Sequence, residues 1–107
     1  MTKNEEINTT MKIIEKLSQM IDEEISDAYK YAKCSLEHDD DPELSRTFTL
    51  LANEELNHMN MLHAQVVRLI KKVREEKGEP PASMLAVYDY LHGKQIDKVS
   101  EVKAILS

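Results

Sequence analysis

Residues that break helices are rare in this chain, and all but one lie in two places. The 107 residues include only two Gly and three Pro, and four of these five lie at Pro42 and within Gly78-Glu79-Pro80-Pro81. Asp41 followed by Pro42 is typical of a helix N-cap and first helical residue, and Gly78 is typical of the residue that ends a helix. The pattern predicts helices over about Asn8 to His38, Pro42 to Lys77 and Ala82 to Leu106, with Gly93 as the place for a kink in the last.

Composition places the chain in the all-α class as a single domain. Residues that favour helices are abundant, strand signals are absent, and aromatic residues make up only 5% of the chain. We expect residues 1–78 to form a long antiparallel two-helix hairpin, and residues 79–107 to form a C-terminal helical region with a role in assembly. Two long helices with so few aromatic side chains cannot cover both their faces, so self-association is expected.

Charge and hydropathy exclude several classes of partner. The net charge of −6 disfavours binding to nucleic acid and to anionic membranes, because both require basic patches. No run of about 20 apolar residues occurs, and the N-terminal residues lack the apolar core of a signal peptide. These features predict a cytoplasmic protein, or one held inside a cytosolic compartment. The single Cys34 excludes a disulfide within one chain, and we interpret it as a structural or inert residue.

Both predicted helices of the hairpin carry a carboxylate within an apolar face. At about 100° per residue, Glu55 shares a face with Phe48, Leu51, Leu62, Val66, Leu69 and Val73, with His58 and Met59 on its shoulders. Glu24 lies in the middle of a face that holds Ile13, Leu17, Met20, Ile21, Ala28, Tyr31 and Ser35. Burial of an ionised carboxylate without a partner costs several kcal/mol. Both glutamates therefore require compensation.

The two glutamates are expected to meet in space. If the hairpin turns near Asp39 and Asp40, Glu24 and Glu55 lie at the same height, roughly 20 Å from the turn. His58 follows Glu55 by three residues and lies on the same side of the helix. A metal ion bound by Glu24, Glu55 and His58 accounts for this arrangement. The alternative is a partly open bundle in which the carboxylates reach water or pair with a lysine.

Other polar groups have simpler explanations. Asp39-Asp40-Asp41 lacks the alternating ligands of a calcium loop and is interpreted as a solvated turn with a helix cap. Asp89 and His92 are predicted to form a solvated pair, and His63 is predicted to be exposed. Four acidic residues near the glutamates form either an entry path for cations or an ordinary wet helix surface: Asp22, Glu23, Asp27 and Glu54.

Two segments resemble the ferritin-like di-iron carboxylate superfamily. Glu24-Ile25-Ser26-Asp27-Ala28-Tyr29-Lys30-Tyr31 resembles the ferritin segment in which a ligand Glu precedes a tyrosine by seven residues, and Glu54-Glu55-Leu56-Asn57-His58 resembles the second ligand segment. The similarity covers roughly Leu17 to Val73. A complete site in that superfamily takes four carboxylates and two histidines from four helices. This chain has half of that set, so the resemblance implies a four-helix bundle formed by two chains about a two-fold axis.

In length, hairpin layout and ligand order the chain is similar to the encapsulated ferritins. That resemblance implies a ferroxidase that oxidises iron(II) with oxygen or peroxide, built from homodimers in a ring, a decamer, and handing iron to an encapsulin shell for storage. It also implies two irons per dimer held by Glu24 and Glu55, one carboxylate pair bridging them, with His58 capping each metal. Tyr31 is either a supporting group that orients a carboxylate or a plain core aromatic.

Iron is not the only metal that these ligands suit. Carboxylate and imidazole also bind manganese and zinc. Since an imidazole must be neutral to bind a metal, affinity is expected to fall below roughly pH 6.5. Two non-enzymatic alternatives stay open. One is a dimer that metal merely holds together, and the other is a metal-free helical adaptor, in which Glu55→Leu would stabilise the protein.

Overall fold

A computed structural model describes residues 2–107, which form three helices: α1 (Lys3–Glu37), α2 (Pro42–Lys77) and α3 (Ala82–Leu106). No strand occurs in this part of the chain. The prediction of an all-α fold is confirmed, as are the bounds expected for α2 and α3. Helix α1 begins five residues before the expected Asn8, because Thr2 accepts a hydrogen bond from the Glu5 amide (3.2 Å) and so caps the helix.

The two turns have the chemistry that their sequences predict. Asp41 accepts a hydrogen bond from the Leu44 amide (3.2 Å), and Pro42 is the first residue of α2. Gly78 ends α2 with φ 86° and ψ −172°, a conformation that is essentially restricted to glycine. Helix α3 continues through Gly93 without interruption, so the residue does not end or divide it.

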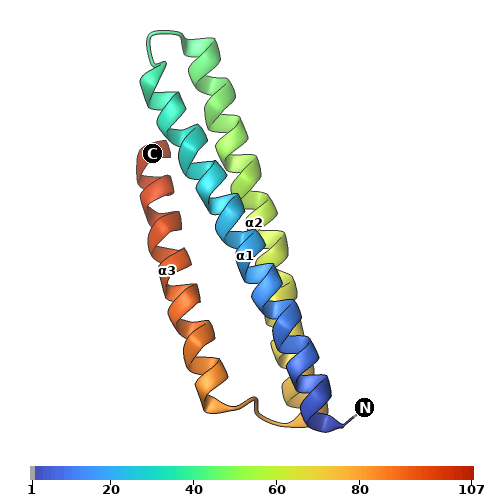
Figure 1. The fold of residues 1–107 in the computed structure, drawn as a ribbon. Helices are drawn as coiled ribbons and strands as arrows, with labels where there is room; N and C mark the ends of the chain where they lie inside the picture. Colours follow the sequence, from blue (N-terminus) through green and yellow to red (C-terminus); the bar gives the residue numbers. More distant parts are fainter. Residues whose placement is uncertain (1) are drawn as a thin grey trace.

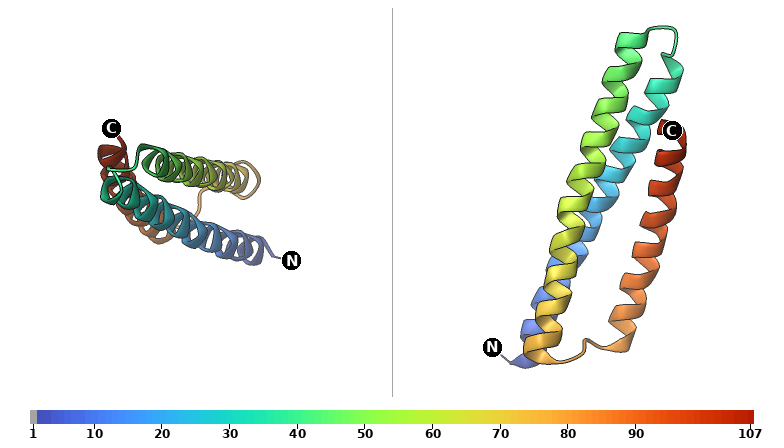
Figure 2. Two further views of the ribbon diagram at one scale, coloured as in Figure 1. Left: turned by 90° about the horizontal axis from the view of Figure 1, so that it is seen from above. Right: turned by 180° about the vertical axis from the view of Figure 1, so that it is seen from behind.

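The helices form an elongated molecule of 59 × 20 × 17 Å. Figure 1 shows α1 and α2 as a long antiparallel hairpin, with α3 running back beside it, parallel to α1. Helix α3 packs chiefly against α1, and the view along the hairpin in Figure 2 shows it on one side of the pair. The opposite side of the hairpin has no third helix to cover it.

The core is narrow and consists of two clusters. The larger cluster joins the N-terminal part of α1 to the C-terminal part of α2, and partly buried residues of α3 pack against it. Its buried members are Ile7, Met11, Ile14, Ile21, Ile25, Val66, Ile70 and Val73. The smaller cluster contains Ala28, Ala32, Ala52, Leu56 and Val102. All three alanines have no exposed surface. Their small side chains let α1, α2 and the C-terminal half of α3 approach closely, which fixes the register of the hairpin.

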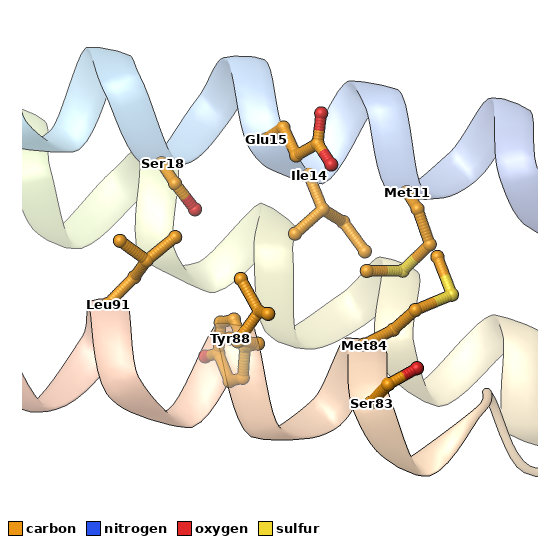
Figure 3. A pocket seen from close by; sticks show the side chains of 9 residues that line it. Met11, Ile14, Glu15, Ser18, Ser83, Met84, Tyr88 and Leu91 are labelled. Atoms are coloured by element: carbon orange, nitrogen blue, oxygen red, sulfur yellow. The ribbon is translucent and has the colours of Figure 1, made fainter.

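The N-terminal half of α3 packs loosely. A cavity of about 220 Å³ separates it from α1, and Figure 3 shows Met11 of α1 and Met84 of α3 pointing toward each other across this space. Two apolar side chains of α3, Val87 and Ile96, are 58% and 52% exposed, because α1 alone cannot cover the full width of this helix.

We find no helix among residues 2–107 that is long and apolar enough to cross a membrane.

Candidate metal centre

Glu24 of α1 and Glu55 and His58 of α2 come together near the middle of the hairpin. One ligand atom from each of the three side chains lies within 4.8 Å of the others. The Nδ1 atom of His58 is 3.5 Å from Oε2 of Glu24 and 3.7 Å from Oε2 of Glu55. The convergence that helical spacing and hairpin register predicted is therefore present in a single chain.

The three side chains differ in exposure. Glu55 is 19% and Glu24 is 26% exposed, whereas His58 is 55% exposed. Oε2 of Glu24 is buried and has no hydrogen-bond partner. An unsatisfied buried carboxylate oxygen is costly, and a cation at this point would satisfy it. The group is thus closed on the core side and open toward solvent through His58.

The neighbouring carboxyl groups disturb each other's ionisation. The pKa of Glu55 is raised above its usual 4.5, first because the Glu24 carboxyl can share a proton with it, and then because of burial and repulsion by the Glu24 charge. His58 acts in the opposite direction, and Asp27, one turn along from Glu24, adds to the repulsion. A proton on one carboxyl partly compensates the pair. A divalent cation would displace that proton and compensate both groups.

The donor set fits a divalent metal of the iron, manganese or zinc type. Two carboxylates and one imidazole are the ligands that these metals accept. One chain provides three ligating side chains, which leaves coordination positions free. The open side of the group faces the uncovered face of the hairpin, where the flanking apolar residues are only half-buried: Leu17, Leu51, Leu62 and Leu69.

Tyr31 lies two turns from Glu24 and is half-buried. Its ring stacks on Phe48, with 6.4 Å between ring centres and 25° between planes. The contact with Phe48 supports the interpretation of Tyr31 as a core aromatic.

The predictions of exposure for His63 and His92 were wrong. Both residues are half-buried, and their rings stack with 4.7 Å between centres and 10° between planes. Tyr88 extends this stack. The periodicity of each helix places both histidines off the apolar faces, so only the packing of α3 beside α2 could have shown that they meet.

The remaining polar candidates lie mostly at the surface. Asp41 caps α2 as expected, and Asp39 and Asp40 are exposed. Asp22, Glu23, Asp27 and Glu54 are exposed as well. Asp22 accepts a hydrogen bond from Nε2 of Gln95 (3.0 Å), which links α1 to α3. Cys34 is a half-buried free thiol.

Comparisons with known proteins assign no family: no family model, no curated protein and no solved structure matches the chain.

Proposed function

We propose that this protein binds iron and acts as a ferroxidase-type oxidoreductase, at a di-iron site that two subunits share. The observation that carries the proposal is the convergence of Glu24, Glu55 and His58 around a buried carboxylate oxygen without a partner. Such a group has an evident use as half of a di-metal carboxylate site. The resemblance of the two ligand segments to ferritin-like proteins supports iron as the metal.

A second subunit would complete the site in both coordination and charge. Three ligating groups per chain are too few to surround two metal ions, while two chains related by a two-fold axis provide four carboxylates and two imidazoles. Four negative charges then balance two divalent cations. The half-buried leucines that flank the group would be covered in the same step, which contributes hydrophobic stabilisation.

The chain's own residues have distinct parts in this proposal. Glu24 and Glu55 would hold the metal, and binding would compete with protonation of Glu55, whose pKa is raised by the neighbouring Glu24 carboxyl and by burial. His58 would bind as the neutral imidazole. Two iron(II) ions held by these residues would each supply one electron to an oxidant, oxygen or peroxide; with hydrogen peroxide the two electrons would yield two hydroxide ions. The flanking leucines would exclude bulk water.

The larger assembly is proposed from resemblance alone. A ring of dimers, an encapsulin shell as partner and a cytoplasmic location follow from the likeness to encapsulated ferritins. The exposed apolar side chains of α3 are consistent with a role of residues 79–107 in assembly. Manganese or zinc at the same ligands is the alternative for the metal.

An anaerobic titration tests the proposal. Metal-free protein is titrated with iron(II), metal is counted per dimer, and oxygen or peroxide is then added while absorbance and oxidant consumption are followed. We expect two irons per dimer and oxidation of both. Glu55→Gln should abolish binding, whereas Glu54→Gln, an exposed neighbour, should leave it unchanged.

The outcomes separate the alternatives. Two metals per dimer without oxidant consumption would mean that metal only holds the helices together. No binding at all, together with a Glu55→Leu variant that dimerises as before, would mean a metal-free adaptor. Either result contradicts the ferroxidase proposal.

A further inference from the structure

A second cluster of titratable residues lies where α3 passes α2, away from the three metal-ligand candidates. His63 of α2 and His92 of α3 stack face to face, with 4.7 Å between ring centres and 10° between planes. Tyr88, one turn before His92, continues the stack at 5.6 Å and 7°. The Tyr88 hydroxyl group lies 3.5 Å from Nε2 of His63. The rings are parallel, so they do not converge on a common metal position, and their contact is one of packing.

The environment of this stack offers no counter-charge to a protonated imidazole. Burial, followed by repulsion from His92, lowers the pKa of His63 below its usual 6.5. Nδ1 of His92 is buried and has no hydrogen-bond partner. In residues 2–107 no carboxylate forms an ion pair with either imidazole. A proton added to either ring would therefore find no compensating charge in contact with it.

The charged groups nearest to the stack do not alter this conclusion. On α2, Lys71 and Arg74 line the groove beside Tyr88, and they are paired with Glu75 and Glu79. On α3, Asp89 lines the same groove, and Lys103 lines the groove next to the two histidines.

Helix α1 contributes Asp22, whose carboxylate is engaged by Gln95, one turn after His92. Lys103 opposes protonation of the rings, and the Asp22 carboxylate is engaged by Gln95. Asp89 lies beside Tyr88 and forms no ion pair with either imidazole.

The stack also lies where it can hold the N-terminal half of α3 on the hairpin. The N-terminal half of α3 borders open space on both sides, a cavity of about 220 Å³ toward α1 (Figure 3) and a groove of about 460 Å³ toward α2. The C-terminal half is held more firmly, by Val102 in the alanine cluster and by the hydrogen bonds of Gln95 to α1. Met84 packs against the larger core cluster, and the aromatic stack is a second contact that holds the N-terminal half of α3 on the hairpin.

We propose that the stack of His63, His92 and Tyr88 is an acid-sensitive latch, which holds the N-terminal half of α3 on α2 when neutral and releases it when protonated. Two imidazolium rings at this separation repel each other in a half-buried site where repulsion is screened less than in water. The rings turn apart toward solvent. Helix α3 stays attached at Gln95 and Val102, while the segment from Ala82 to His92 opens away from the hairpin.

Amide hydrogen exchange of the metal-free protein tests the latch. Exchange in residues 84–92 is measured at pH 7.5 and 5.5 for wild type, His63→Phe and His92→Phe, because phenylalanine keeps a flat ring without a titratable proton. Variants are compared at the same pH, so the intrinsic pH dependence of exchange cancels. We expect wild type to match the variants at pH 7.5 and to exchange roughly fourfold faster or more at pH 5.5, the factor for two unit charges at this separation even in bulk water.

His38→Phe is the matched control. His38 also stacks on an aromatic ring, Phe48, at 5.8 Å and 24°, but it lies at the exposed hairpin turn. This variant should retain the acid-induced opening of α3. Residues 99–106 serve as an internal reference whose protection should not change between the variants.

A measurement on the wild type alone guards against variants that fail to fold. Titration of the imidazole carbon-bound protons by NMR should show that His63 takes up its proton below pH 6.5, together with shifts of the Tyr88 ring signals. The latch is wrong if His63 titrates at or above pH 6.5, or if residues 84–92 of His63→Phe open in acid as they do in wild type. Since metal is absent throughout, neither result depends on the proposed ferroxidase.

Discussion

At the scale of single residues, the two glutamates on the apolar face of the hairpin are unfavourable, because burial takes their carboxyl groups out of water. Glu24 and Glu55 occupy positions that a hydrophobic residue would fill with no cost, and one oxygen of Glu24 is buried without a hydrogen bond. The Glu24 carboxyl, burial and the repulsion between the two charges raise the pKa of Glu55, so that its ionised form is less favourable here than in water. A residue that costs stability in the empty state and is satisfied by a cation is typical of a binding site.

Replacement of Glu55 by its neutral isostere tests this unfavourable burial in metal-free protein. A pKa raised above 4.5 means that the folded chain binds the proton more tightly than the unfolded chain. That contribution is fully present below pH 4.5 and is lost as pH rises through the folded-state pKa. In a chelator at pH 7, Glu55→Gln should therefore be more stable than wild type by about 1 kcal/mol, measured by urea unfolding at fixed protein concentration.

The control for this measurement is Glu54→Gln, which removes the same charge from an exposed position. Its stability at pH 7 should stay close to that of wild type. If Glu55→Gln and Glu54→Gln behave alike at pH 7, the carboxyl groups at the site do not repel each other as the structure indicates.

Metal binding should compete with protons at the same residues. Because a bound cation displaces the proton on Glu55 and requires a neutral imidazole at residue 58, affinity for iron(II) or zinc should decrease steadily from pH 7.5 to 5.5. Calorimetric titration in two buffers of different ionisation enthalpy should also detect proton release. Affinity that holds steady down to pH 4 would exclude this ligand set.

At the scale of the helix, replacement of each of the two glycines by alanine should change stability in opposite directions. Gly93 lies inside α3, and an added Cβ atom would meet no neighbouring atom within 4 Å. Gly93→Ala should stabilise the protein by about 0.5–1 kcal/mol, because alanine loses less entropy in a helix. Gly78→Ala should destabilise it by about 1–3 kcal/mol, because φ 86° and ψ −172° strain any residue with a Cβ atom. Thermal unfolding compares the two, and equal shifts of the same sign would contradict the assigned backbone conformations.

Helix boundaries and the convergence of Glu24, Glu55 and His58 were predictable because they depend on local rules. Asp41, Pro42 and Gly78 fix the hairpin turn and the end of α2, and helical period together with hairpin register places Glu24 opposite Glu55. The position of α3 depends instead on packing between elements distant in the sequence. For this reason periodicity did not reveal that His63 meets His92. The early start of α1 depends on the Thr2 cap, a signal that the sequence does contain.

At the scale of the whole molecule, the hairpin has one covered and one uncovered side. Helix α3 lies on one side (Figure 2), and the other side presents a stripe of partly exposed apolar residues with the metal-ligand group in its middle. Ile13 and Met20, on the same face of α1 as Glu24, are 45% and 39% exposed. Large exposed side chains in a continuous stripe are typical of an interface. The proposed second subunit would cover them.

A charge placed on this stripe should therefore block assembly without touching the ligands. Ile13 lies eleven residues before Glu24, roughly 16 Å along the helix, so Ile13→Lys leaves the three ligating side chains intact. Burial of an unpaired lysine in an interface costs several kcal/mol, and we expect dimer dissociation to become at least about tenfold more favourable by sedimentation equilibrium. Val87→Lys, on the exposed face of α3, is the control and should leave the dimer intact.

Iron(II) binding should weaken in parallel with dimerisation in Ile13→Lys and recover at high protein concentration, because each half-site depends on its partner. If Ile13→Lys dimerises as wild type does, or binds iron as tightly when monomeric, the uncovered side of the hairpin is not where a shared site is built.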